Sequence, residues 1–279
     1  MKDKIVLITG ATAGIGKETA RALAKKGYTL YLHGRNALKG EKVVEEIKKD
    51  SGNSNIELLL ADLGDLAAVR ELANSFKQKE TKLDILINNA GYLAKERWMA
   101  KSGHESMLTI NFLAPFLLSH ELLDCLKKAE QGRIVNVSSN AMLDKIVLDN
   151  LNSEQKFSQM GTYGHTKSLL TSYTNELARR LADTKVTANS LHPGVVFTQM
   201  IKDYAGPAKG LVKFLGSMMF KSPAQGAENS IYVATAPELA AVSGKYFVKK
   251  KAVSPKSVTL DPQIAEEVWQ KAANMTAIA

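Results

Sequence analysis

Cysteine is almost absent from this chain. Cys125 is the only one among 279 residues, so no internal disulfide can form, and this usage suits a reducing compartment. Cys125 lies in an apolar run with helical spacing, and we interpret it as a buried thiol rather than a nucleophile. No cluster of cysteines and histidines has the spacing of a zinc site, so we predict no metal site.

Long apolar runs are also missing. No stretch reaches the roughly eighteen apolar residues that a membrane-spanning helix needs. The N-terminus passes from a charged start straight into a short apolar run and a glycine turn, which is not the pattern of a signal peptide. We therefore expect a cytoplasmic protein.

Acidic residues are outnumbered by basic ones. The chain has 37 Lys and Arg against 28 Asp and Glu, a net charge of +9. The basic residues are scattered, apart from a short run at 249–251, and no nucleic-acid-binding module accompanies them. We expect no nucleic-acid partner, because the positive balance suits an anionic cofactor or a membrane surface equally well.

Strand and helix patterns alternate along the whole chain. Short apolar runs predict strands at 4–9, 28–33, 56–61, 83–87, 133–137, 185–191 and 244–249. Helical periodicity predicts helices at 17–26, 38–49, 66–78, 103–128, 162–183, 223–235 and 262–275. Alternation with short connections implies right-handed βαβ crossovers. We predict a single α/β domain over 1–279, a Rossmann-type, doubly wound, mainly parallel seven-stranded sheet with helices on both faces.

A glycine-rich turn, GATAGIG, lies between the first predicted strand and the first predicted helix. Glycines allow a tight turn and let the backbone approach a pyrophosphate closely. The helix N-terminus adds free N–H groups and a partial positive charge. We therefore predict a dinucleotide-binding turn, with the contacts made by Gly10, Thr12, Gly14, Ile15 and Gly16.

Tyr163 and Lys167 are four residues apart in a predicted helix, so their side chains share one face. A lysine charge beside the phenol favours phenolate and lowers the tyrosine pKa toward the range of a general acid or base. His165, two positions after Tyr163, points to another face, and we interpret it as structural.

The glycine spacing G-x-x-x-G-x-G and the Tyr-x-x-x-Lys motif together resemble the short-chain dehydrogenase/reductase family. The resemblance implies a catalytic set of Asn111, Ser139, Tyr163 and Lys167, with Ser138 as the alternative serine. In this scheme Ser139 binds the substrate oxygen and Tyr163 exchanges a proton with it. Lys167 lowers the tyrosine pKa and holds the nicotinamide ribose. Asn111 kinks its helix and holds a water of a proton relay.

The cofactor preference is predicted from the end of the second strand, His33-Gly34-Arg35-Asn36. An acid there would bind the ribose 2′-hydroxyl of NAD, whereas this stretch has none. Arg35 can hold a 2′-phosphate, Asn36 lies next to it, and Lys17 adds charge. We predict NADP in preference to NAD.

Further cofactor contacts are implied by the resemblance. They follow the third, fourth and sixth strands and comprise Asp62, Leu63, Asn89, Ala90, Gly91, Pro193, Gly194, Val196 and Thr198. Asp62 is equally well placed to cap a helix, and the asparagine amides can also tie neighbouring strands together.

The glycine-turn sequence, an insertion before Tyr163 and the segment SGKYF at 243–247 resemble the retinol dehydrogenase-like branch. The resemblance implies a lipophilic aldehyde, ketone or alcohol as substrate, with substrate-loop segments near 142–160 and 198–222. The stretch 208–220 is interpreted as a lid, a core helix or a peripheral membrane contact. The resemblance also implies a homodimer or homotetramer through the helices that carry Asn111 and Tyr163.

Two other classes of function are compatible with parts of the sequence. One is a non-catalytic NADP-binding sensor on the same fold, and the other is an interaction protein with a basic surface. The complete catalytic set argues against the sensor, and the scattered charge argues against the interaction protein.

Overall fold

The computed structural model describes residues 4–196 and 221–278. Within them, one eight-stranded sheet has the order β3-β2-β1-β4-β5-β6-β7-β8. The strands are β1 (Ile5–Ile8), β2 (Thr29–Gly34), β3 (Ile56–Leu60), β4 (Ile85–Asn88), β5 (Arg133–Val137), β6 (Thr187–His192), β7 (Tyr246–Val248) and β8 (Lys251–Val253). All neighbours pair in parallel except β7 and β8. The predicted doubly wound, mainly parallel single-domain fold is confirmed.

The sheet has one strand more than the seven expected from the sequence. β8 runs antiparallel to β7, with Val248 opposite Lys251. Between them, Lys249 and Lys250 have φ values of 50° and 64°. Positive φ at both central residues is what a two-residue type I′ hairpin turn needs. Lysine does not signal such a turn, so the basic run gave no sequence indication of a hairpin.

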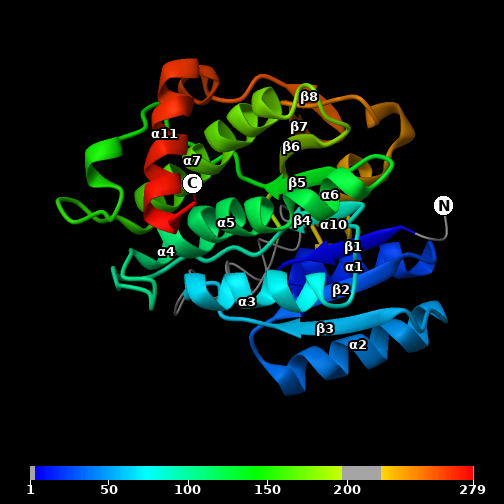
Figure 1. The fold of residues 1–279 in the computed structure, drawn as a ribbon. Helices are drawn as coiled ribbons and strands as arrows, with labels where there is room; N and C mark the ends of the chain where they lie inside the picture. The colour runs from blue at the N-terminus through cyan, green and yellow to red at the C-terminus, as the bar shows by residue number, and fades with distance from the viewer. Residues whose placement is uncertain (1–3, 197–220, 279) are drawn as a thin grey trace.

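Helices cover both faces of the sheet (Figure 1). α1 packs against α2 and α10 on one face, while α3, α5 and α7 lie on the other, and α11 packs outside α7. The bounds are α1 (Gly14–Lys25), α2 (Ala37–Ser51), α3 (Leu66–Lys77), α4 (Ser106–Leu108), α5 (Ala114–Glu121), α6 (Leu123–Lys128), α7 (Gln159–Arg180), α10 (Pro223–Thr235) and α11 (Pro262–Thr276). Most predicted helices are therefore found within a few residues of their expected ends.

The long helix expected over 103–128 is found only in part, because it begins at Ser106 and is interrupted. The chain forms α4, a π-helix (η1, Thr109–Leu113), α5 and α6 in succession. Pro115 is the second residue of α5 and lies just after the π-helix. Leu122 separates α5 from α6 because its φ and ψ of −102° and 4° leave the helical range. The π-helix is centred on Asn111, and such bulges occur frequently at functional sites.

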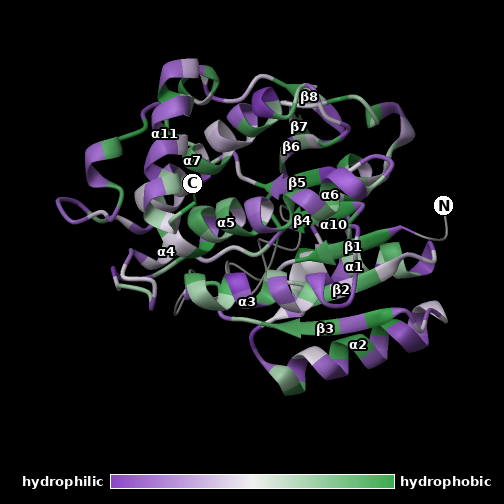
Figure 2. Ribbon diagram, viewed as in Figure 1, coloured by the Kyte–Doolittle hydropathy of each residue, from purple (hydrophilic) through white to green (hydrophobic). Residues whose placement is uncertain are grey.

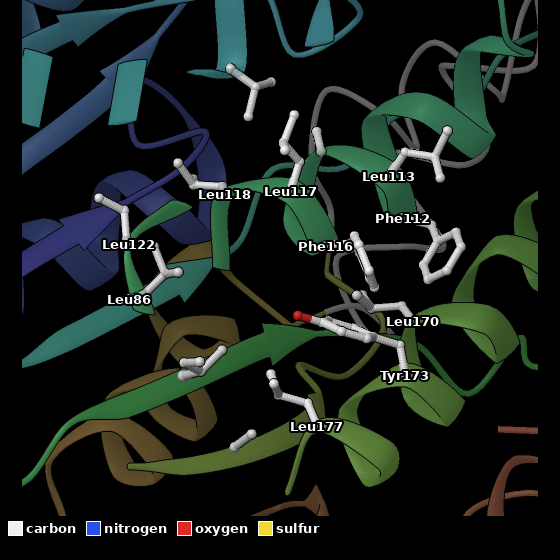
Figure 3. Packing of buried hydrophobic residues seen from close by; sticks show 14 of the residues in the cluster. Leu86, Phe112, Leu113, Phe116, Leu117, Leu118, Leu122, Leu170, Tyr173 and Leu177 are labelled. Carbon is white, nitrogen blue, oxygen red and sulfur yellow. The ribbon is translucent and has the colours of Figure 1, made fainter. Parts of the chain in front are cut away.

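Apolar residues fill the strands and the inner faces of the helices (Figure 2). On the α5/α7 side, Phe112 and Phe116 point toward Tyr173 of α7 (Figure 3). The ring centroids of Phe116 and Tyr173 are 5.0 Å apart. From α11, Trp269 packs edge-on to Phe116 at 5.4 Å. This packing fixes α7, which carries Tyr163 and Lys167, against the sheet.

The strand order reverses between β1 and β4. Strands β2 and β3 lie to one side of this point and β5 to β8 lie to the other. Sheets of this kind bind ligands outside the carboxyl ends of the strands at such a switch point. Among the described helices, none has the length and apolar character to cross a bilayer. The segment 208–220 lies outside the described residues.

Candidate active site

The glycine turn connects β1 to α1 at the switch point. Gly10 has a φ of 65°, and a Cβ there would lie 2.9 Å from the Ala90 backbone. Only glycine tolerates both conditions. α1 begins after Ala13 with no side-chain cap and no acid in its first turn. Its free N–H groups and positive end therefore fit the pyrophosphate of a dinucleotide.

Neighbouring elements hold this turn in place. Thr12 lies against Gly34 at the end of β2. Ile15 and Val196 both pack against Gly226 of α10. The turn and the segment after β6, two regions predicted to touch the cofactor, therefore lie close together around α10.

His33 is a site residue that the sequence interpretation missed. The Gly10 N–H donates to its Nδ1 at 3.2 Å, and its Nε2 is 3.1 Å from the carbonyl oxygen of Ala61. His33 is buried, and desolvation lowers the pKa of its imidazole to about 4. The neutral ring therefore links the glycine turn to the end of β3. No local sequence pattern marks this role, because its two partners lie 23 and 28 positions away along the chain.

The segment after β4 ties two strands together, as expected for its asparagines. Asn89 donates from Nδ2 to the Thr9 carbonyl at 2.8 Å and to the Gly10 carbonyl at 3.2 Å. Thr9 Oγ1 accepts the N–H groups of Asn89 and Ala90, both at 3.0 Å. Gly91 follows at the surface. These contacts hold the small residues of this segment beside the glycine turn.

The residues expected at the adenosine end lie at the ends of β2 and β3. Arg35 is exposed. Asn36 caps α2, accepting the Lys39 N–H at 2.9 Å. Asp62 Oδ1 accepts the Gly64 N–H at 2.9 Å, and Leu63 is buried.

Lys17, which is expected to add charge at this end, forms an ion pair in the structure. Its ammonium is paired with Glu46 of α2 at 2.6 Å. Lys17 lies on the first turns of α1, and its side chain is directed to α2. No local sequence pattern predicts this contact.

Tyr163 and Lys167 lie on α7, as their spacing predicts. The Lys167 ammonium is 5.6 Å from the centroid of the Tyr163 ring and donates to the Val137 carbonyl at 2.9 Å. Ser139 follows β5, and its hydroxyl is close enough to the Tyr163 phenol to lower the pKa of that group. Three of the four predicted catalytic side chains therefore meet at the carboxyl end of β5.

The expected lowering of the tyrosine pKa is wrong in direction. Burial raises the pKa of Tyr163 to about 12, although the neighbouring Ser139 hydroxyl lowers it in part. Burial also lowers the pKa of the Lys167 ammonium to about 8. Desolvation disfavours the charged form of each group and is the largest influence on both pKa values. The phenol is therefore protonated at neutral pH.

Asn111 lies in the π-helix and is fully buried. Its Oδ1 accepts the Tyr92 N–H at 2.7 Å, and its Nδ2 donates to the Tyr92 carbonyl at 2.9 Å. Nδ2 also lies 3.2 Å from Thr166 Oγ1, next to Lys167. The amide thus joins the segment after β4 to α7.

Ser138, the alternative serine, has a structural setting. Its hydroxyl lies 2.8 Å from Thr171 Oγ1 and donates to the Lys167 carbonyl at 3.2 Å. These contacts point its oxygen into α7 rather than toward Tyr163.

The segment after β6 begins at His192, whose Nδ1 accepts the Asn140 N–H at 3.3 Å. Pro193 follows, and Gly194 lies against the side chain of Lys221. Val196 is buried. Thr198, the last predicted cofactor contact, lies outside the described residues.

The insertion before Tyr163 runs along α7. The Leu143 N–H donates to Ser168 Oγ at 2.9 Å, and the Val147 N–H donates to His165 Nε2 at 3.0 Å. His165 therefore makes a structural contact, and burial lowers the pKa of its imidazole. Two polar side chains of α7 thus fix the insertion beside the catalytic residues.

Asn152 joins the insertion to the segment after β4. Its carbonyl accepts from Arg97 Nε at 2.9 Å, and its Oδ1 accepts the Glu105 N–H at 3.0 Å. Between these two anchors lie Trp98 and Met99, which are 41% and 43% exposed. The two loops therefore form one connected wall that presents large apolar side chains.

No group of potential metal ligands occurs within 4–196 and 221–278. The side chains assembled at the strand ends are a phenol, a hydroxyl, an ammonium and an amide, which suit proton transfer to and from an oxygen. The hydride would have to come from a cofactor.

Comparison with known proteins places this site in a family. The short chain dehydrogenase family model matches residues 4–207. Retinol dehydrogenase 12 from Mus musculus is 39% identical over 276 residues, covering 99% of this chain and 87% of the relative. Polyprenol dehydrogenase from Homo sapiens is 35% identical over 283 residues, covering 99% and 86%. A solved structure of an uncharacterized protein from Mycobacterium paratuberculosis has a TM-score of 0.79 at 27% identity, covering 98% of this chain and 93% of that chain. The chain therefore belongs to the short-chain dehydrogenase/reductase family of oxidoreductases, which act on CH–OH and C=O groups with a nicotinamide cofactor, and it is similar to the retinol dehydrogenases within it.

Proposed function

We propose that this protein is an NADP-dependent oxidoreductase that transfers a hydride between the nicotinamide and a lipophilic carbonyl or alcohol. Tyr163 is its general acid or base. The observation that carries the proposal is the meeting of three groups at the carboxyl end of β5: the Tyr163 phenol, the Ser139 hydroxyl that lowers its pKa, and the Lys167 ammonium 5.6 Å from the centre of the same ring.

The proton chemistry follows from the burial of these groups. A phenol with a raised pKa is protonated at neutral pH and donates to the oxygen of a carbonyl that is being reduced. Ser139 hydrogen-bonds the same oxygen and stabilises its developing negative charge. The Lys167 ammonium stabilises the phenolate that remains. Bound NADP(H) supplies or accepts the hydride.

Asn111 has a positioning role in this proposal. Its amide holds the Tyr92 backbone and contacts Thr166, so it keeps α7 aligned with the segment after β4. A water relay from Asn111 to Lys167 remains a prediction of the family resemblance.

The choice of NADP is supported by the residues that follow β2. Arg35 is exposed there, and no acid follows the strand to repel a 2′-phosphate. Arg35→Asp is expected to weaken NADP binding by about tenfold or more and to improve NAD binding, measured by fluorescence titration. Lys49→Asp makes the same type of charge change at the exposed far end of α2. It should leave the ratio of NADP affinity to NAD affinity unchanged. Equal NADP affinity in both variants would refute the assignment of Arg35 to the 2′-phosphate of NADP.

A lipophilic substrate is supported by three exposed large apolar side chains: Trp98 and Met99 on the segment after β4, and Met160 on α7. Met160 is 45% exposed and lies one helical turn before Tyr163, on the same face of α7. Exposed large apolar side chains that gather beside a site commonly mark a ligand surface. Two relatives in the comparison are named for retinol and polyprenol, both long apolar alcohols.

The function is tested by following NADPH absorbance with decanal, retinal and a set of small ketones. Tyr163→Phe is expected to lower kcat by about 10²-fold or more while leaving NADPH affinity within about twofold. Tyr31→Phe is the matched control, because Tyr31 is a buried tyrosine on β2. Near-normal turnover by Tyr163→Phe would refute the scheme. Tight NADPH binding without turnover of any substrate would instead favour the sensor.

The position of α11 bears on the expected assembly. The expected dimer or tetramer would use the helices that carry Asn111 and Tyr163, yet α11 packs on this face and places Trp269 against Phe116 and Tyr173. We therefore favour a monomer over an assembly through this face.

We propose a cytoplasmic location, with peripheral membrane contact through 208–220 as the alternative. Pelleting with liposomes distinguishes the two.

A further inference from the structure

One buried tyrosine has no part in the proposed proton transfer. Tyr246 lies in β7 with 4% of its surface exposed. It pairs in register with Ser190 of β6, so its place in the sheet is fixed on one side by a parallel strand. Its phenol donates to Asn140 Oδ1 at 2.8 Å. Asn140 directly follows Ser139 in the chain.

The turn that carries Ser139 is anchored on both sides. Before it, the Ser138 N–H donates to a β6 carbonyl at 2.7 Å. After it, the Asn140 N–H donates to His192 Nδ1 at 3.3 Å. The Ala141 N–H donates to Ser139 Oγ itself at 3.1 Å. The direction of the serine hydroxyl therefore depends on how Asn140 is held.

The Asn140 side chain is exposed, so little packing restrains it. The Tyr246 hydroxyl comes from a buried, hydrogen-bonded strand and is the rigid partner in the contact. A donor fixed on a strand positions its acceptor more precisely than a contact between two loops does.

We propose that Tyr246 is a positioning residue for Ser139: its hydroxyl holds Asn140, and Asn140 holds the turn that directs the serine hydroxyl to Tyr163 and the substrate oxygen. This inference rests on the proposed function, because it assigns Tyr246 a role in the same proton transfer. A displacement of about 1 Å at a catalytic group can cost as much as 10²-fold in rate.

The surroundings keep Tyr246 in its donor form. Burial and the nearby Tyr163 both raise the pKa of the Tyr246 phenol. The hydroxyl therefore stays protonated through the working pH range and continues to donate to Asn140.

The first test is Tyr246→Phe, assayed with decanal and NADPH. This change removes only the hydroxyl, and we expect kcat to fall about tenfold while the KM for NADPH stays within about twofold. Tyr31→Phe is the matched control, since Tyr31 is 3% exposed and its hydroxyl donates to Glu80 at 2.9 Å. It should lose a similar amount of thermal stability and keep its kcat. An unchanged kcat in Tyr246→Phe would overturn the proposal.

A double-mutant cycle separates positioning from a general structural effect. If Tyr246 acts through Ser139, then adding Tyr246→Phe to Ser139→Ala should change the residual rate by less than about twofold. An equal loss in both backgrounds would overturn the proposal. Near-normal turnover by Ser139→Ala alone would instead overturn the proposed function.

Asn140→Ala provides the same test from the exposed side of the contact. It removes the acceptor without touching the buried strand, so it is usable even if Tyr246→Phe does not fold. It is expected to reproduce the tenfold loss and the non-additivity with Ser139→Ala, to within about twofold. Wild-type kcat in this variant would also overturn the proposal.

Discussion

The buried imidazole of His33 makes a quantitative prediction about stability and pH. Its Nδ1 accepts the Gly10 N–H, so this nitrogen carries no proton in the folded chain. Nε2 therefore bears the hydrogen and donates to the Ala61 carbonyl at 3.1 Å. Protonating Nδ1 would place two N–H groups against each other in a buried place.

The magnitude follows from the difference in pKa between the two states. Burial lowers the pKa of folded His33 from 6.5 to about 4. Between these values the unfolded chain binds more protons than the folded one, so the free energy of unfolding decreases as pH falls through this window. The full difference corresponds to about 3 kcal/mol, of which about 2.5 kcal/mol is reached at pH 4.5. Above about pH 7 the contribution is constant.

His33→Gln isolates this term. The glutamine amide can accept from Gly10 and donate to Ala61, but it does not titrate. Urea unfolding of both proteins between pH 4.5 and 7.5 is expected to show a steeper loss on acidification for the wild type, by about 2 to 3 kcal/mol. Other titrating groups, including His192, are the same in both proteins and cancel in the comparison. Parallel stability curves for the two proteins would refute the reasoning.

Three further predictions come from the other named contacts. Burial lowers the pKa of Lys167 to about 8, so carbonyl reduction should decline as pH rises above this value, and initial rates that stay constant to about pH 9.5 would contradict this. Trp269→Ala should lower the free energy of unfolding by about 2 kcal/mol, because the half-buried indole contacts Phe116 and also stacks under Arg180 at 4.1 Å. A decrease of less than about 0.5 kcal/mol in the free energy of unfolding, measured with urea, would contradict a stabilising role for these contacts. Asn152→Ala should raise the KM for retinal several-fold and leave kcat/KM for acetaldehyde unchanged, because it removes the hydrogen bond to the Glu105 N–H that holds the segment with Trp98 in place. Equal effects on both substrates would argue against a role of this segment in binding retinal.

The covered α5/α7 face has a consequence for assembly. Phe116 and Tyr173 pack against each other in the core (Figure 3), and both rings also contact Trp269 of α11. Removing α11 would expose this aromatic cluster, and large exposed apolar patches drive association. The full chain is expected to elute as a monomer in size-exclusion chromatography, whereas a chain ending before Pro262 should associate. A dimeric full chain would mean that another face forms the contact.

Local sequence signals predicted elements whose determinants lie within a few residues. α10 begins and ends at the predicted residues, because Ser222 and Gln225 form a capping box and Pro223 occupies the first turn. The glycine turn and the Tyr163–Lys167 pair are likewise set by residues that lie close together in the sequence. Each needs only chain geometry, so each could be placed before any tertiary contact was known.

Contacts between distant segments were not predictable in this way. The helix over 103–128 has continuous helical periodicity, yet the amide of Asn111 binds the Tyr92 backbone nineteen positions away, at a π-helix. Lys17 is a plausible phosphate ligand by position, and its ion pair with Glu46 of α2 was not indicated by the sequence. Neither partner is marked by spacing, because the sheet order brings them together.

The sequence by itself therefore determined the fold class, the family and the order of the site residues along the chain. Only the tertiary structure decided how those residues behave. Burial reversed the expected direction of the Tyr163 pKa shift, because desolvation depends on every element packed around the phenol. The roles of His33 and Tyr246 likewise arise from hydrogen bonds across 23 and 106 positions of sequence. Periodicity reports which face of an element is apolar, whereas the pairing of polar atoms is set by the packed three-dimensional arrangement.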